Sequence, residues 1–180
     1  MNTFFTADTH FGHGNIIKYC NRPFKNSFEM DEMIIENWNN KIQKHDNVYH
    51  LGDFAFREPE TILKYIDRLN GNIFLIKGNH DRINGDIKNK FVWVRDLAEI
   101  KVNDQNITLC HYAMKVWNKS HHGSWHLYGH SHGTLPDDLY SRSYDVGMDA
   151  NNFTPLSFEE IKKIMDAKIF KPIDHHGGRD

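Results

Sequence analysis

The decapeptide NIFLIKGNHD, residues 72–81, joins a short apolar run to a polar turn, and this combination indicates the fold class. The apolar half predicts a buried β-strand over 72–76, because a short apolar run bounded by turn residues is typical of a strand in a parallel sheet. Two upstream stretches have the same form: residues 2–7 run into Asp8, and residues 48–51 run into Gly52 and Asp53. The sequence therefore predicts three strands that each end in polar residues.

Two helices are predicted between these strands. The first spans residues 28–43, where apolar residues recur at steps of three and four, at Met30, Met33, Ile34, Trp38 and Ile42. The second begins near Pro59 and stops before Gly71. The order strand–helix–strand–helix–strand is that of a parallel α/β sheet with right-handed crossovers.

The second half of the chain has a different pattern. Strands are predicted over five short segments, at 91–95, 100–102, 106–110, 125–128 and 143–146. Their hairpin-like spacing favours a second, mostly antiparallel sheet. A closing helix is predicted to begin after Ser157, which forms a capping box with Glu160. Since neither half is long enough to bury a stable hydrophobic core alone, we expect one domain over residues 1–171, followed by a flexible tail over 172–180.

Composition narrows the functional classes. With 180 residues, 39% hydrophobic and 26% charged, the chain has an ordinary globular composition. A net charge of −2 argues against tight non-specific binding to nucleic acid. No apolar run approaches the ~18 residues of a membrane span, the first residues do not resemble a signal peptide, and two cysteines suit a reducing compartment, so a cytoplasmic protein without a membrane partner is expected. The 13 histidines are unusually many, and histidine is the commonest metal ligand.

Potential metal ligands follow the predicted strands of both halves. They are Asp8, His10, Asp53, Asn79, His111, His130 and His132. Because ligands of open α/β sheets gather at the carboxyl ends of strands, these side chains could converge on one crevice. Carboxylate, imidazole and amide donors without a thiolate suit Mn, Fe or Zn. Seven candidates exceed the four ligands of a structural zinc site, whereas two ions that share a bridging carboxylate would use them all.

Five sequence blocks occur in a fixed order between residues 8 and 132: Asp8-x-His10, Gly52-Asp53, Gly78-Asn79-His80-Asp81, His111 and Gly129-His130-x-His132. Together they resemble the motif set of the calcineurin-like metallophosphoesterase superfamily. The segment 8–13 and the downstream Asp145-Val146-Gly147 also resemble small bacterial and phage members. The resemblance implies an α/β fold, a four-layer α/β/β/α sandwich with mixed sheets.

The resemblance also implies a reaction, the hydrolysis of a phosphate ester with two divalent metal ions, Mn first and Fe, Zn or Ni as alternatives. The first ion would be held by Asp8, His10 and His132, and the second by Asn79, His111 and His130, while Asp53 would bridge both. A bridging hydroxide would attack phosphorus. His80 would act as the general acid that protonates the leaving oxygen.

The second block departs from the serine/threonine protein phosphatases, which continue it as Gly-Asp-x-x-Asp-Arg-Gly. Here Phe56 replaces the aspartate that pairs with the catalytic histidine, so protein phosphatase activity is not expected. Arg57 matches the phosphate-binding arginine and is predicted to contact substrate. His13, three residues beyond His10, is a second predicted substrate contact.

The predicted substrate is a small phosphodiester, nucleotide-derived ones included. Two loops, 12–26 and 112–125, mix cations with aromatic residues, which suits a phosphate joined to a flat group: Lys18, Arg22, Lys25, Lys115, Lys119, Tyr19, Tyr112, Trp117 and Trp125. A monoester dianion would need several fixed cations, and a diester fewer. The alternatives are a nuclease that acts on DNA or RNA, and a catalytically silent metal-binding interaction scaffold.

Overall fold

The computed structural model describes residues 1–56 and 59–174. Arg57 and residues 175–180 lie outside this part, so the predictions made for Arg57 and for most of the C-terminal tail fall on residues that are not described. None of the helices in the described part is long and apolar enough to cross a membrane. The first sheet comprises β1 (Thr3–Thr6), β2 (Asn47–His50), β3 (Asn72–Ile76), β4 (Val94–Arg95) and β9 (Leu156–Ser157). The second comprises β5 (Leu97–Val102), β6 (Gln105–Cys110), β7 (Trp125–Tyr128) and β8 (Ser143–Asp145). The helices are α1 (Gly14–Tyr19), α2 (Ser27–Lys41), α3 (Pro59–Ile66), α4 (Gly85–Lys88) and α5 (Phe158–Asp166), with short 3-10 helices η1 (Ser120–His122) and η2 (Met148–Ala150).

The first sheet has the order β4-β3-β2-β1-β9. The predicted parallel pairing of β1, β2 and β3 is confirmed, and β9 adds an antiparallel edge strand. The strand predicted over 91–95 is wrong in extent and place. Only Val94 and Arg95 are extended, and they pair in parallel with Leu75 and Ile76 of β3 in the first sheet.

The second sheet has the order β5-β6-β7-β8. Its first pair is an antiparallel hairpin, whose turn places Asn103 and Asp104 at φ 46° and 67°. The next two pairs, β6–β7 and β7–β8, are parallel, so the prediction of a mostly antiparallel sheet is wrong. The connections over 111–124 and 129–142 are long enough to return the chain to the same end of the sheet. The predicted α/β architecture with two mixed sheets is confirmed.

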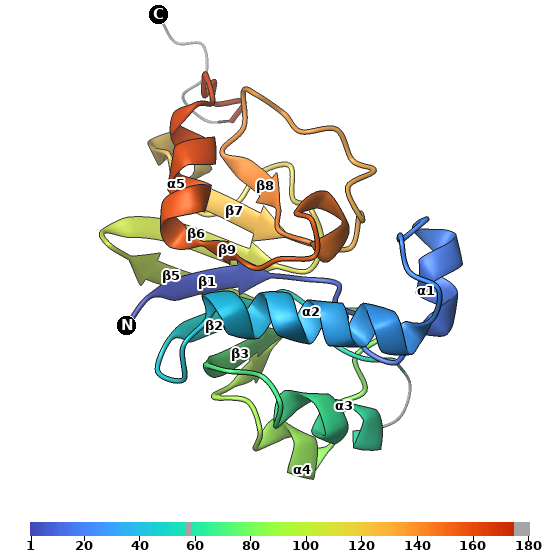
Figure 1. The fold of residues 1–180 in the computed structure, drawn as a ribbon. Coiled ribbons are helices and arrows are strands. Elements are labelled where there is room, and N and C mark those ends of the chain that lie inside the picture. The colour runs from blue at the N-terminus through green and yellow to red at the C-terminus, as the bar shows by residue number, and fades with distance from the viewer. Residues whose placement is uncertain (57–58, 175–180) are drawn as a thin grey trace, which may run out of the picture.

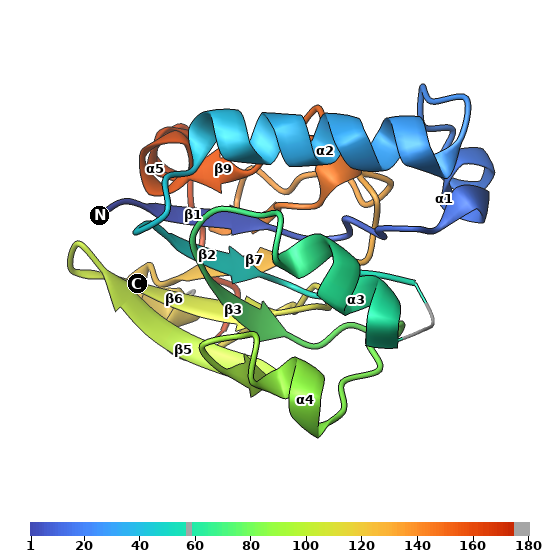
Figure 2. The same cartoon turned by 60° about the horizontal axis from the view of Figure 1, so that its bottom comes forward.

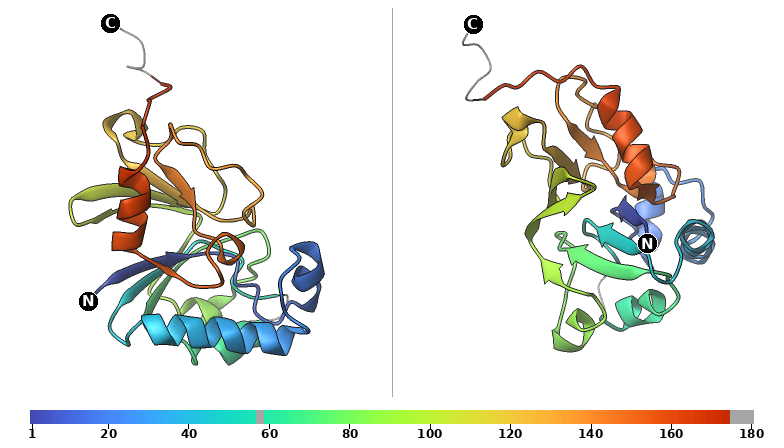
Figure 3. Two further views of the ribbon diagram at one scale, coloured as in Figure 1. Left: turned by 45° about the horizontal axis from the view of Figure 1, so that its top comes forward. Right: turned by 90° about the vertical axis from the view of Figure 1, so that its left-hand side faces the viewer.

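The two faces of the first sheet belong to different hydrophobic clusters. Phe4 points to the side covered by α2 and α3, whereas Phe5 points to the second sheet, since neighbouring residues of a strand face opposite ways. Figure 2 shows α2 and α3 on one side of the first sheet and the second sheet on the other. Helix α5 contributes Phe158, Ile161 and Met165 to the cluster between the sheets. Its ribbon, orange to red in Figure 3, lies along the outside of the sandwich.

Two helices illustrate how local sequence signals act here. In α5, Ser157 and Glu160 form the predicted capping box, which satisfies backbone N–H groups at the first turn. In α2, the predicted apolar stripe is confirmed at Met30, Ile34 and Trp38, which are fully buried. It is wrong at Met33, which lies on the flank of the stripe and is 42% exposed.

Candidate metal centre

The loops that follow β1, β2, β3, β6 and β7 meet at one end of the sandwich, where the strand arrows point in Figure 1. Backbone hydrogen bonds join them directly. The Asp8 N–H donates to the Gly52 carbonyl at 2.9 Å, and the His10 N–H donates to the Asp53 carbonyl at 3.0 Å. Gly52 has φ 99° and no space for a side chain, because an added Cβ would lie 2.6 Å from His111 Nδ1. The sequence thus allows these loops to approach closely.

Five of the seven predicted ligands have a left-handed backbone, with φ between 48° and 67°: Asp8, His10, Asp53, His130 and His132. This conformation is unfavourable for residues other than glycine. A residue that the surroundings hold in it costs the folded state of order 1–3 kcal/mol. Its concentration at these positions is typical of a functional site. The side chains of these residues, which lie on successive loops, are grouped around a shared centre.

Asp8, His10 and His132 form the first candidate group, with one ligand atom of each residue within 4.8 Å of the others. Asp8 and His10 are buried, and both have an atom without a hydrogen-bond partner in the described structure, Asp8 Oδ1 and His10 Nε2. Burial raises the pKa of Asp8 to about 7 and lowers the pKa of His10 to about 2. His10 is therefore neutral, with a lone pair at Nε2, and a cation bound beside Asp8 would favour the ionised form of that carboxyl.

Asp53, His111 and His130 form the second candidate group, again within 4.8 Å. The side-chain oxygen of Asn79 lies 3.1 Å from His111 Nε2 and 3.0 Å from His130 Nδ1, so this amide joins the group. His111 Nδ1 lies 2.7 Å from the Leu51 carbonyl and donates to it, which leaves Nε2 as the nitrogen available to an ion.

One carboxylate oxygen lies between the two groups. Asp53 Oδ2 is 3.6 Å from His10 Nε2 and 3.5 Å from His111 Nε2. Burial alone would raise the pKa of Asp53, but the hydrogen bond and charge of His111 outweigh burial and hold this pKa well below its usual range. The other oxygen, Oδ1, accepts a 2.9 Å hydrogen bond from the His80 N–H. Asp53 is thus ionised and firmly held at the centre.

These observations fit divalent metal ions. The donors are carboxylate, imidazole and amide, as Mn, Fe and Zn prefer, and two of them, Asp8 Oδ1 and His10 Nε2, are buried without a hydrogen-bond partner among the described residues. Cys20 adds a thiol near His132 and Asp149, but burial raises its pKa to about 11, so it stays protonated near neutral pH.

The raised pKa of Asp8 predicts a pH effect on the metal-free protein. Between about pH 4 and pH 7, Asp8 is protonated when folded and ionised when unfolded, so its contribution to stability falls as pH rises. Asp8→Asn removes this titration. In the presence of chelator, we expect the variant to gain stability over the wild type by on the order of 1 kcal/mol per pH unit across this range. Urea unfolding at several pH values measures the difference, and a flat difference would contradict the prediction.

A cavity of about 370 Å³ adjoins the centre, and its walls include Asn79 and His80. The exposed ring of His80 lies edge-on to His10, with 5.5 Å between ring centroids. His13 stacks on Phe56 at 3.6 Å, and both line the same cavity. The two predicted substrate-side histidines, His13 and His80, therefore lie beside the seven predicted ligands.

Among the described residues, no hydrogen bond or ion pair joins the carboxylate of Asp81 to the ring of His80. Its carboxylate accepts hydrogen bonds of 2.8–2.9 Å from the backbone N–H groups of Asp53, Phe54 and Gly78. Asp81 thus ties the loop after β2 to the loop after β3. The position of Asp81 next to His80 in the sequence therefore serves the structure of the loop.

Removal of the Asp81 carboxylate should therefore destabilise the fold. Asp81→Ala leaves three N–H groups without their acceptor, and we expect a loss on the order of 2–3 kcal/mol in the free energy of unfolding. Glu36→Ala, an exposed position on α2, is the matched control and should stay within about 0.5 kcal/mol of the wild type. Equal stability of the two variants in urea would refute this role.

Three functional candidates escaped the sequence analysis or were misread there. Arg82 lines the cavity beside His80, although no motif singled it out. Asp149 holds His132 through a 2.7 Å contact to Nδ1. The interpretation of Arg22 as a substrate cation is wrong, because its side chain is buried and bonded to Asp149. Trp117 and Trp125 are also buried, so they pack in the interior and are not positioned to stack on a substrate.

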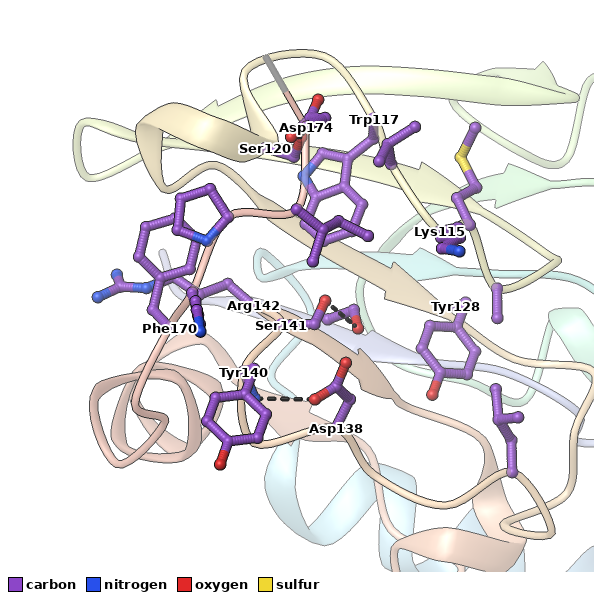
Figure 4. A pocket seen from close by; sticks show the side chains of 18 of the residues that line it. Lys115, Trp117, Ser120, Tyr128, Asp138, Tyr140, Ser141, Arg142, Phe170 and Asp174 are labelled. Atoms are coloured by element: carbon purple, nitrogen blue, oxygen red, sulfur yellow. Dashed lines mark hydrogen bonds between the residues drawn. The ribbon is translucent and has the colours of Figure 1, made fainter. Parts of the chain in front are cut away.

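A second cavity, of about 250 Å³, lies on the outer side of the second sheet (Figure 4). Trp117, Tyr128 and Phe170 line it, together with Lys115, but none of the seven predicted ligands does, nor does His13 or His80. The carboxylate of Asp174, the last described residue, lies 3.3 Å from Ser120 Oγ at its rim. The predicted site residues His13, Asn79 and His80 line the cavity beside the candidate metal centre instead.

The chain is similar to known proteins over most of its length. The family described as "Calcineurin-like phosphoesterase superfamily domain" matches residues 1–141. The uncharacterised protein MJ1445 of Methanocaldococcus jannaschii is 32% identical over 179 residues, which cover 95% of this chain and 96% of that protein. The gene 66 protein of Mycobacterium phage L5 is 26% identical, with coverage of 83% and 87%. The solved structure of AQ665, a protein of unknown function from Aquifex aeolicus, has a TM-score of 0.70 at 23% identity and covers 91% of this chain and 98% of its own, a likeness of fold alone.

Proposed function

Because this chain belongs to the calcineurin-like phosphoesterase superfamily, we propose that it hydrolyses phosphate esters, small phosphodiesters in particular, with two divalent metal ions. The observation that carries the proposal is the position of Asp53 Oδ2, about midway between imidazole nitrogens of the two candidate groups. A shared carboxylate is what a pair of ions needs. Two separate mononuclear sites would not place one oxygen at 3.5–3.6 Å from both.

The proposed ligands divide between the two ions as the two groups do. Asp8, His10 and His132 would hold one, and Asn79, His111 and His130 the other, with Asp53 shared. The chemistry that such a pair supplies is a more acidic water and neutralised phosphoryl oxygens. Mn²⁺ suits this donor set, with Fe, Zn or Ni as alternatives.

His80 is the proposed general acid. Its backbone N–H is bonded to Asp53, so the residue is anchored to the centre, while its ring lines the adjoining cavity. A phosphate held at the centre would direct its leaving oxygen into that cavity. His80 would then donate a proton to this oxygen as the P–O bond breaks.

The preference for diesters follows from the charges around the site. Among the described residues that line the adjoining cavity, Arg82 is the one lysine or arginine. A dianionic monoester needs more compensation than a singly charged diester. Tyr19, which is 75% exposed, and the stacked pair of His13 and Phe56 offer flat apolar surface to a planar leaving group such as a nucleoside. Arg57 remains a predicted phosphate contact.

The test compares two nitrophenyl esters. The protein is stripped with chelator and reloaded with Mn²⁺, and kcat/KM is measured for bis(p-nitrophenyl) phosphate and p-nitrophenyl phosphate, then for cyclic nucleotides. We expect the diester to be preferred at least about tenfold, or ~1.4 kcal/mol in the barrier. A preference for the monoester would contradict the substrate class. Two bound ions with no hydrolysis of either ester would instead indicate a silent metal-binding scaffold.

A further inference from the structure

We propose that Arg22 and Asp149 together position His132 and the Asp8 loop, and thereby set the affinity of one of the two ion sites and not of the other. We call this pair the Arg22–Asp149 brace. The inference rests on the proposed function, because it takes His132 and Asp8 as ligands of an ion. It assigns the brace residues no contact with substrate.

The carboxylate of Asp149 orients the ring of His132. Its Oδ2 lies 2.7 Å from His132 Nδ1, and since a carboxylate oxygen accepts, Nδ1 carries the donated hydrogen. This leaves Nε2 as the ring nitrogen that can bind an ion, and a fixed ring plane aims it. The ring lies 5.2 Å from that of His10, centroid to centroid, within the first candidate group.

The guanidinium of Arg22 holds Asp149 in place with two parallel hydrogen bonds. Nε donates to Oδ1 at 2.8 Å, and a terminal nitrogen donates to Oδ2 at 2.7 Å. The same group also donates to the main-chain carbonyls of Asp8 at 2.7 Å and Thr9 at 3.2 Å. One planar cation therefore ties Asp149 to the left-handed turn that carries Asp8, whose φ is 58°.

The brace is fully satisfied and buried. Arg22 is 4% exposed, and its five N–H groups have five acceptors, the fifth being the sulfur of Met30 at 3.3 Å. Burying an ion pair costs a large desolvation energy, so such a pair is weak evidence for stability alone. The buried pair of Arg22 and Asp149 is explained instead by its effect on His132, which it holds in position.

The brace serves the two groups unequally. His132 and Asp8 both belong to the first group, and both are hydrogen-bonded to the brace. In the second group, His111 is oriented by the main-chain carbonyl of Leu51, which directly follows β2. Within the described residues, Arg22 and Asp149 form no hydrogen bond or ion pair with Asn79, His111 or His130. Loss of the brace should therefore affect one site.

The experiment measures Mn²⁺ binding to the stripped protein by calorimetry, without substrate. The wild type is expected to bind two ions. In Asp149→Asn and Arg22→Met, one site should weaken about 10- to 100-fold, as is usual when an outer hydrogen-bond partner of a ligand is lost, and the other should stay within about twofold. The control is Lys41→Met, which removes the Lys41–Glu160 ion pair between α2 and α5 and should bind both ions as the wild type does.

Arg22→Met separates positioning from simple charge. Removing a positive charge near a cation site would tighten binding if only charge mattered, so a tighter site would overturn the proposal. Arg22→Lys keeps the charge without the planar fork and should still weaken the first site. Asp149→Asn keeps the shape of the side chain, so it carries the test if Arg22→Met does not fold.

Four further outcomes are decisive. Unchanged binding of both ions by Asp149→Asn would overturn the brace, and so would equal weakening of both sites, which would indicate a general loss of structure. A wild type that binds no ion would overturn both the brace and the proposed function. Selective weakening in a protein that hydrolyses no phosphate ester would leave the brace intact and reject the proposed function.

Discussion

Turnover by His80→Ala is expected to be about 10²–10⁴-fold slower than that of the wild type, with both ions still bound. The ring of His80 lines the cavity beside the centre, and His80 belongs to neither of the two candidate ligand groups. Its removal therefore takes away a proton donor and leaves the donor set in place. The loss should be smallest for leaving groups such as nitrophenolate, which depart without a proton.

The measurement is kcat/KM over a series of diesters whose leaving groups differ in basicity, together with the metal content of each variant. His45→Ala is the matched control, because His45 is exposed in the loop that precedes β2 and should change neither quantity. Equal losses on good and poor leaving groups would remove His80 from the role of general acid.

Asp53→Asn should have an effect of similar size for a different reason. The amide oxygen can still accept the hydrogen bond from His80, so the loop can keep its shape, but the negative charge between His10 and His111 is lost. Both ions would lose a ligand charge at once. We expect fewer than two ions per chain at micromolar metal, and turnover reduced by more than the about 10- to 100-fold that loss of an outer hydrogen-bond partner costs.

Metal content by elemental analysis and turnover with added Mn²⁺ check this prediction. Asp96→Asn is the control, since the side chain of Asp96 is 83% exposed and forms an ion pair with a surface lysine, Lys77. An Asp53→Asn protein that keeps two ions and full activity would exclude a bridging role for this carboxylate.

Local signals predicted most of the architecture. The strands at 72–76 and 125–128 have the predicted bounds, and the capping box of Ser157 and Glu160 is present. These features depend on residues close together in the chain, where turn chemistry and hydrophobic periodicity act. The pairing of β6, β7 and β8 could not be read in this way, because the direction of a returning strand depends on the path of a long connection and not on the strand itself.

The candidate site divides in the same manner. Seven predicted ligands lie together because each follows a strand, and parallel strands deliver their carboxyl ends to one edge. The sequence therefore determined which residues meet. It did not determine their left-handed backbone or the use of Asp81 as a tie between loops, which arise from contacts among the loops themselves.

Arg22 marks the limit of sequence reasoning most clearly. In the sequence it is one more cation in a loop between Lys18 and Lys25, and nothing nearby distinguishes it. Its partner Asp149 is 127 residues away, and only the packing of the α1–α2 connection against η2 brings the two side chains within 2.8 Å. Burial then decides the role of the guanidinium, because a charge removed from water must find its partners inside the fold. The sequence by itself determined the set of candidate ligands and the parallel pairing of β1, β2 and β3, and the tertiary structure decided which charges support those candidates.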